Sequence, residues 1–272
     1  MRPHRLEELT QSDFAALLAE DPVILLPLGS QEGQGPHCPM GDFRLSAKIA
    51  DLVAQRTGAL AAPVLPFGHA DFFRDYPGGL QLRPETFTAV LTDMLNGLVE
   101  HGLTRLLILN GHTTNAPLIS QVTRQIRRQS GVALASVDLW PSVPAPLMRR
   151  LFGEAPVRGH GAEPVTSVMM HLLPGEVRAL PDSPRARPGR LLDLPLRGVS
   201  GADFEGLRVN LPVTAAEIAP DGRLGGDASR ASAGAGAAIT ADLVARLAAL
   251  VTHLQSAQTA EAAPTPPEET PR

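Results

Sequence analysis

Four short apolar runs, separated by longer stretches of mixed composition, limit the folds that this chain can adopt. Each run has the length of a β-strand and is bounded by Gly, Pro or Asn, and they cover residues 23–28, 62–65, 105–109 and 132–137. None of them alternates strictly between apolar and polar residues. This is the pattern of strands that are buried on both faces, as in a parallel sheet.

Helical periodicity occupies the segments around these runs. Apolar residues recur at helical spacing over residues 45–53 and 87–98, and we expect further helices over 114–129 and 162–173 and a closing helix from about residue 231. Strands and helices therefore alternate along the chain. This alternation predicts an α/β sandwich with a mostly parallel sheet.

The composition indicates which partners and which cellular compartment to expect. The chain has 272 residues, 43% of them apolar, which is enough for one substantial hydrophobic core. Its 24 basic and 28 acidic residues give a net charge of −4, so no polybasic surface is available for nucleic acid. The first residues lack the pattern of a signal peptide, and no apolar run approaches the roughly 20 residues that span a bilayer. We expect a cytoplasmic protein with no membrane partner.

Two segments depart from the alternation of strands and helices. Residues 174–200 contain many Pro and Arg and show little periodicity, so we expect an irregular surface excursion that could pack on a neighbouring subunit. The last residues contain no large apolar side chain. We therefore expect a single domain over residues 1–254 and a disordered tail over residues 255–272.

Two residue types are nearly absent, and this removes several kinds of catalytic site. Lys48 is the only lysine, and it stands neither in the GK[ST] motif of a P-loop nor in the context of a Schiff-base lysine. Cys38 is the only cysteine, which excludes an internal disulfide and a metal site made of cysteines. Any metal must therefore be held by histidines and carboxylates.

Carboxylates and histidines follow several of the predicted strands. Because loops at the carboxyl ends of parallel strands build the ligand site, we expect these side chains to meet. They are Glu32, His37 and Asp42 after the first strand, His69 after the second, His112 after the third, and His160 and Glu163 at the start of a later helix. Taken singly, Asp42 could merely cap a helix, Glu163 could be an ordinary first-turn glutamate, and each histidine could be structural. Their convergence from separate segments predicts one shared site.

Three carboxylates with one or two imidazoles form an oxygen and nitrogen ligand set suited to Zn²⁺, Mn²⁺ or Fe²⁺. A divalent ion in such a site lowers the pKa of bound water to about 7 and polarises a carbonyl, so it supports hydrolysis without a serine or cysteine nucleophile. The chain contains no Gly-x-Ser-x-Gly nucleophile motif. The ligand set therefore predicts metal-dependent hydrolysis.

Five segments carry a recognisable series of motifs. They are GSQEGQGPHCPMGD at 29–42, HADFFRDYPGGLQL at 69–82, NGHTTN at 110–115, HGAEPVTS at 160–167 and GGDASRASAGAG at 225–236. In this order they resemble the creatininase family of metal-dependent amidohydrolases, whose motifs include Gly-Ser-x-Glu-x-His-Gly-Pro-His and Asn-Gly-His-x-x-Asn. The likeness runs from about residue 20 to about residue 250.

The resemblance implies a fold, a metal centre and an assembly. The fold would be a single-domain, three-layer α/β/α sandwich, with one or two divalent ions per chain and a homohexamer as the oligomer. By position, the metal ligands would be Glu32, Asp42, His112 and Glu163, with Asp42 as the bridge between two ions. The catalytic residues would be His160, which would shuttle protons, and Glu163.

The chain also departs from the family pattern. Gln34 stands where the family has its second histidine, and one residue is missing between Pro39 and Asp42, so His37 is expected either to replace that histidine as a ligand or to leave one metal site weak. Thr114 stands where creatininase has a glutamate, and Val165 replaces a second family glutamate. These departures argue against creatinine as the substrate.

The leading hypothesis is hydrolysis of a small amide, lactam or formamide C–N bond by metal-activated water. His69, Tyr76 and Trp140 are expected to line the substrate pocket at the ends of the loops. One alternative is a relative that trims a peptide or removes a formyl group in cofactor biosynthesis. Another is a metal-poor binding or scaffold subunit, which Gln34 and Val165 motivate.

Overall fold

A parallel four-stranded sheet forms the centre of the molecule in the computed structural model, which describes residues 3–155, 157–182, 189–197 and 201–257. Its strands are β1 (Ile24–Leu28), β2 (Leu60–Ala61), β3 (Leu106–Asn110) and β4 (Ala135–Asp138). They lie in the order β2-β1-β3-β4, and every pairing is parallel. The predicted α/β fold with a parallel sheet is therefore confirmed.

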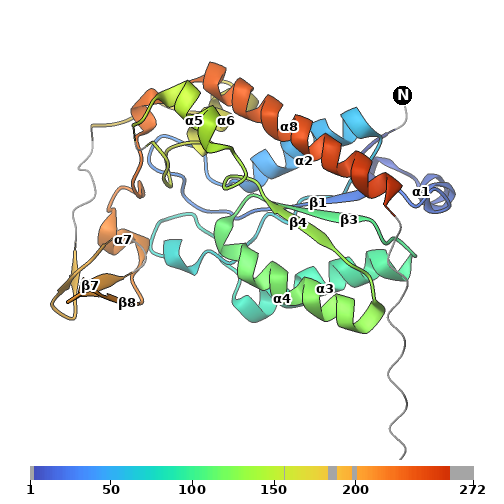
Figure 1. Cartoon of the computed structure of the whole chain (residues 1–272), viewed down its shortest axis with the longest axis horizontal. Coiled ribbons are helices and arrows are strands. Elements are labelled where there is room, and N and C mark those ends of the chain that lie inside the picture. The colour runs from blue at the N-terminus through green and yellow to red at the C-terminus, as the bar shows by residue number, and fades with distance from the viewer. Residues whose placement is uncertain (1–2, 156, 183–188, 198–200, 258–272) are drawn as a thin grey trace, which may run out of the picture.

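The two faces of the sheet are both covered, which makes the three layers visible in Figure 1. On one face lie α2 (Phe43–Thr57), α5 (Ala145–Phe152), α6 (Val165–Leu172) and α8 (Ala233–Ser256). On the other lie α3 (Pro84–Glu100) and α4 (Ala116–Ser130), with α1 (Gln11–Leu18) packed at the same core. Along β1, Leu25 enters the first core while Ile24 and Leu26 enter the second, so an uninterrupted apolar run is what the strand requires.

Local sequence signals set the ends of several helices. Both α2 and α4 end at a glycine with positive φ, Gly58 and Gly131, which is the conformation of a common helix C-terminus. Pro84 opens α3, and Thr10 forms a capping box with Asp13 at the start of α1. Short 3₁₀ helices in the part of the chain that the structure describes are η1 (Leu6–Glu8), η2 (Asp71–Phe73), η3 (Thr113–Asn115) and η5 (Ala228–Arg230).

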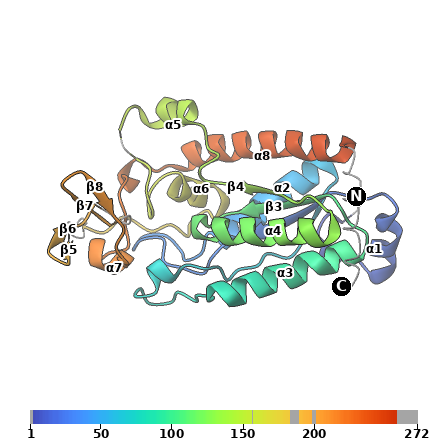
Figure 2. The same cartoon turned by 60° about the horizontal axis from the view of Figure 1, so that its bottom comes forward.

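A small group of elements extends from one end of the sandwich, opposite α1 (Figure 2). It consists of the hairpins β5 (Arg190–Leu191) with β6 (Leu194–Pro195) and β7 (Ala202–Phe204) with β8 (Leu207–Val209), together with α7 (Ala215–Ile218). The expectation of an irregular segment over 174–200 therefore needs correction, because it contains a short hairpin. Residues 183–188 and 198–200 lie outside the described residues.

Two boundaries also differ from the sequence prediction. The second strand was expected at 62–65, but β2 is formed by Leu60 and Ala61, and Leu65 makes only an isolated bridge to Leu28. The disordered tail was expected from residue 255, whereas α8 continues to Ser256 because Leu254 still packs against the core. Residues 258–272 lie outside the described residues.

The long helix α8 has the length and apolar composition of a helix able to cross a membrane, and half of that stretch is buried inside the protein. The helix contains no long continuous run of large apolar residues, because its apolar character comes largely from alanine and from spaced Leu and Val. Its buried residues, among them Ile239, Leu243 and Leu247, lie in the core shared with α2 and α6. This packing accounts for α8 as a core helix.

Two glycines in α8 provide a test of this helix packing. A Cβ added at Gly236 would lie 1.9 Å from the Ser167 carbonyl oxygen of α6, whereas one added at Gly234 would meet nothing within 4 Å. We expect Gly236→Ala to lower the free energy of unfolding by about 1–3 kcal/mol because the helices must move apart. Gly234→Ala should be neutral, or stabilising by up to about 1 kcal/mol. Equilibrium denaturant unfolding measures both, and equal stability of the two variants would contradict the close approach of α6 and α8.

Candidate metal centre

The order of the strands creates a crevice beside β1 and β3. From β1 the chain passes to β2 on one side and returns to β3 on the other, so the loops that follow β1 and β3 leave the sheet in different directions. In open α/β sheets, ligands bind at such a switch point, outside the carboxyl ends of the strands. Glu32 and Asp42 follow β1, and His112 follows β3.

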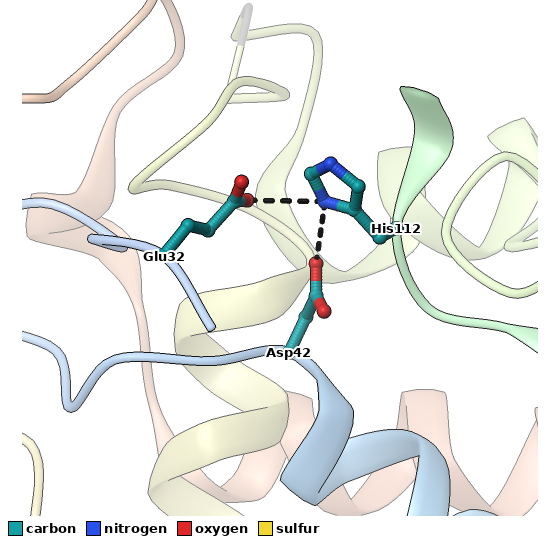
Figure 3. Close-up of side chains that lie close together, drawn as sticks. All are labelled: Glu32, Asp42 and His112. Atoms are coloured by element: carbon teal, nitrogen blue, oxygen red, sulfur yellow. Dashed lines mark hydrogen bonds and ion pairs between the residues drawn. The ribbon is translucent and has the colours of Figure 1, made fainter. Parts of the chain in front are cut away.

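These three side chains meet in the crevice (Figure 3). The His112 Nδ1 atom lies 3.0 Å from Asp42 Oδ2 and 3.2 Å from Glu32 Oε1. All three residues are buried, with at most 4% of their surface exposed. Their ligand atoms lie within 4.8 Å of one another, and they form the one group of this kind among the residues that the structure describes.

The loop after β1 aims Asp42 at the site rather than at the helix that it precedes. Asp42 is the N-cap residue of α2, but its side chain makes no capping hydrogen bond. Instead its Oδ1 atom accepts a hydrogen bond of 2.7 Å from the Ser30 amide. Gly29 permits this packing, since a Cβ there would lie 2.3 Å from the Phe43 Cα atom. The explanation of Asp42 as a simple helix cap is therefore wrong.

Burial and the charges of the three groups on one another set their pKa values. Burial raises the pKa of Glu32 to about 7 and also raises the pKa of Asp42. Burial disfavours the charged form of His112, but the two carboxylates outweigh it and raise the pKa of His112 to about 10. The Glu32 Oε2 atom has no hydrogen-bond partner among the described residues. A bound cation would satisfy the open oxygen and compensate the burial of these acids, so the donor set fits a divalent cation.

Two further residues of the sequence prediction line the same cavity. Glu163 is 1% exposed, both of its carboxylate oxygens lack a hydrogen-bond partner among the described residues, and burial raises its pKa to about 7. It precedes α6, which begins at Val165, so it is not a first-turn residue. Gln34 also lines the cavity, and its Nε2 atom donates a hydrogen bond of 2.9 Å to Glu32 Oε1.

His160 lies on the wall of the cavity with its ring firmly held. Its Nε2 atom is 2.7 Å from the Gly33 carbonyl oxygen, which can only accept, so Nε2 carries the proton. Its ring stacks on Phe73 with centroids 4.0 Å apart, and its Nδ1 atom lies 3.8 Å from Glu32 Oε1. Burial lowers the pKa of His160 to about 4. The imidazole is therefore neutral, and Nδ1 is an available proton acceptor.

His37 does not join the metal centre, contrary to the expectation that it could replace the family histidine. It lies neither in the group of ligands nor on the described wall of the cavity. The positive φ of Gly35 turns the chain, and the His37 Nε2 atom faces the Thr166 hydroxyl at 3.5 Å. Burial and the nearby Arg223 guanidinium lower the pKa of His37.

The cavity has a volume of about 570 Å³ and an aromatic wall that includes Phe72, Phe73 and Trp140. The indole N–H of Trp140 donates to the Gly111 carbonyl oxygen, which fixes the ring. His69 and Tyr76 are not part of the described wall, because the His69 ring faces the Leu82 carbonyl and the Tyr76 hydroxyl donates to the Ala219 carbonyl. The expected role of these two residues in lining the pocket therefore needs correction.

Sequence reasoning missed two residues that shape the cavity. Phe73 stands in the segment HADFFRDYPGG, where two adjacent phenylalanines in a polar turn were a usable signal of an aromatic wall. Thr114 was noted only as a departure from the family pattern, although its hydroxyl lies 2.6 Å from His112 Nε2. Nothing in the sequence alone indicates that contact.

Comparison with known proteins agrees with this site. The family description "Creatininase: Creatinine amidohydrolase" matches residues 7–251. Creatinine amidohydrolase from Pseudomonas putida is 30% identical over 185 residues, which are 61% of this chain and 71% of that protein. A mycofactocin precursor peptide peptidase from Mycobacterium tuberculosis (strain ATCC 25618 / H37Rv) is 28% identical over 206 residues, 70% of this chain and 72% of that one.

Solved structures give the same result for the whole fold. A structure titled "Creatininase Mn" superposes with a TM-score of 0.78 at 26% identity, covering 94% of this chain and all 100% of that one. A mutant creatininase of Zn-Zn type superposes with a TM-score of 0.75 at 25% identity and covers 94% of this chain and 100% of that one. Because the family match spans nearly the whole described fold and the buried acids and imidazole lie together in its crevice, the chain belongs to the creatininase family of amidohydrolases.

Proposed function

We propose that this amidohydrolase holds a divalent cation with Glu32, Asp42 and His112 and hydrolyses the C–N bond of a small amide, lactam or formamide. The observation that carries the proposal is the burial of these three ligand types within 4.8 Å of one another. Relatives whose titles name Mn and Zn support Mn²⁺ or Zn²⁺ as the ion, and Fe²⁺ suits the same donors.

We propose one ion per chain rather than two. Gln34 presents its side-chain N–H to Glu32 instead of a ligand atom, and Thr114 offers a hydroxyl where creatininase has a glutamate. His37 supplies no substitute, because it lies outside the described group of ligands. Asp42 then serves a single ion and is not a bridge. Glu163, with its unpartnered oxygens on the same cavity, is a fitting fourth ligand.

We propose that His160 carries out the proton transfers. A bound divalent cation would polarise the amide carbonyl and lower the pKa of water to about 7. The neutral His160 ring accepts a proton from the attacking water at Nδ1 and donates it to the leaving nitrogen, because its Nε2–H stays bonded to the Gly33 carbonyl. Stacking on Phe73 holds the ring plane during both transfers.

The cavity bears on the choice between substrates. A volume of about 570 Å³ is within the range of sites that hold drug-sized molecules, and a small lactam alone would leave much of it unfilled. Peptide trimming is therefore the second candidate function, and the relatives named as precursor peptide peptidases support this hypothesis. A parallel assay of lactams, formamides and short peptides separates the candidates.

The hypothesis of a metal-poor binding or scaffold subunit fits the site less well. A metal-poor binding subunit has no need to bury Glu32 and Glu163, whose unpartnered oxygens are costly unless a cation satisfies them. A homohexameric assembly and a cytoplasmic location stay predictions, and light scattering of the purified protein measures the first of them.

The metal site is tested by a substitution that removes the charge of one metal ligand and keeps the shape of its side chain. We expect the purified protein to bind about one Mn²⁺ or Zn²⁺ per chain, and chelation to abolish hydrolysis until the metal is restored. Asp42→Asn should weaken Mn²⁺ binding by more than about 100-fold. That is the largest loss expected when a residue that only supports a metal ligand is changed. Asp242→Asn, which alters only an exposed ion pair on α8, is the control. Full metal content in the Asp42→Asn variant would contradict the proposed metal site.

The role of His160 is tested by kinetics on the metal-loaded enzyme. We expect His160→Gln to lower kcat by about 10²–10⁴-fold, the usual contribution of a general acid or base, with little change in metal content. The matched control is His253→Gln, at an exposed position near the end of α8. The rates should be measured with whichever lactam, formamide or short peptide is hydrolysed fastest. A kcat close to that of the unsubstituted enzyme would remove His160 from the proton transfers.

A further inference from the structure

The hydroxyl of Thr114 lies between His112 and a backbone carbonyl. Its Oγ1 atom is 2.6 Å from His112 Nε2, on the side of the ring opposite the two carboxylates. The same oxygen is in hydrogen-bond contact with the His69 carbonyl oxygen. Thr114 stands in η3, two residues after His112, and lines the cavity.

The number of protons fixes the direction of both hydrogen bonds. A carbonyl oxygen can only accept, so the single hydroxyl proton of Thr114 is donated to His69. If that proton were turned toward His112 instead, the hydroxyl and carbonyl oxygens would face each other with no hydrogen between them. The Thr114 oxygen therefore accepts, and the Nε2 atom of His112 is the donor.

This direction leaves Nδ1 as the ligand atom of His112. A ring that keeps its proton on Nε2 presents the Nδ1 lone pair when it is neutral, and Nδ1 is the atom that faces Glu32 and Asp42. Histidines that bind metals usually donate their other ring N–H to a fixed acceptor, which sets both the tautomer and the orientation of the ring.

The carbonyl at the end of this chain of hydrogen bonds is itself held in place. The His69 amide donates to the Asn115 Oδ1 atom at 2.9 Å, and the Asn115 side-chain amide donates to the Gly29 carbonyl at 3.2 Å. Asn115 is fully buried. The backbone after β2 is thus tied to the loops after β1 and β3, so the acceptor of the Thr114 proton has a fixed position.

We propose that Thr114 is a positioning residue for the metal centre: it accepts the Nε2–H of His112, relays the contact to the His69 carbonyl, and so directs Nδ1 toward the cation. The inference rests on the proposed metal site, and it assigns a role to the residue that replaces a glutamate of creatininase. Thr114 would act on the cation only through His112.

The test compares Thr114→Val with Thr114→Ser and with Thr113→Val. Valine keeps the branched shape but places a methyl group against Nε2, and because Thr114 is exposed, this methyl also keeps a water molecule from taking the place of the hydroxyl. Serine keeps the hydroxyl. Thr113 is the adjacent exposed threonine, and no hydrogen bond of its side chain to His112 is found, so it controls for the substitution itself.

Mn²⁺ and Zn²⁺ affinities, measured by calorimetry or by competition with a chelator, are the primary result. We expect Thr114→Val to bind about 10–100-fold more weakly, and both Thr114→Ser and Thr113→Val to bind like the unsubstituted protein. Nitrogen NMR shifts of His112 in the Zn²⁺-loaded protein should report a protonated Nε2, and thermal unfolding of the metal-free variants checks that each one folds.

The outcomes separate this inference from the proposed function. If the unsubstituted protein binds the ions and Thr114→Val binds them equally well, or if the NMR shifts place the proton on Nδ1, the role of Thr114 is wrong while the metal site stands. If the unsubstituted protein binds neither ion, the metal site is wrong and the role of Thr114 is wrong with it. A loss in Thr113→Val equal to that in Thr114→Val would also overturn the inference.

Discussion

The parallel pairing of β1 with β3 is the constraint on which the metal centre depends. The register places Leu28 opposite Asn110, and the ladder continues past the strand ends through the hydrogen bond from the Gly111 amide to the Leu28 carbonyl. A Cβ at Gly111 would lie 2.0 Å from the Ser46 hydroxyl, so the end of β3 packs directly on α2, the helix that Asp42 precedes. A slip of one residue in this pairing would turn His112 to the opposite face of the sheet.

The same crevice gives its two histidines opposite properties. His112 is buried between two carboxylates, which raise its pKa to about 10, whereas burial without an acidic hydrogen-bond partner lowers the pKa of His160 to about 4. Paired groups whose environments drive their pKa values apart are typical of sites where one group stabilises charge and the other moves protons. The difference between the two pKa values follows from where the histidines lie. His112 follows β3 and lies beside Glu32 and Asp42, whereas His160 lies against Phe73 and the Gly33 carbonyl.

The parts of this arrangement that could be predicted from the sequence are those that the chain encodes locally. Apolar runs and turn residues located β1, β3 and β4 and placed Glu32, Asp42 and His112 after the carboxyl ends of β1 and β3. The motif series identified the family. Side-chain directions within the loops could not be predicted, because distant contacts set them. The Tyr76 hydroxyl bonds to Ala219 and the His37 ring faces Thr166, each more than 120 residues away along the chain. The closing helix expected from about residue 231 is present as α8, because its apolar residues recur at helical spacing along the chain.

Gln34 and Thr114, the two departures from the family pattern at the metal centre, act on opposite sides of the same triad. Gln34 donates its side-chain N–H to Glu32 Oε1, and Thr114 accepts from His112 Nε2. Neither offers a negatively charged or imidazole ligand atom, but each makes a hydrogen bond to one side chain of the buried polar network. Each departure thus replaces a potential ligand with a hydrogen bond to one member of the triad. In the proposed single-ion site these two contacts would hold Glu32 and His112 in position, whereas a chain that had merely lost its metal would gain nothing from them.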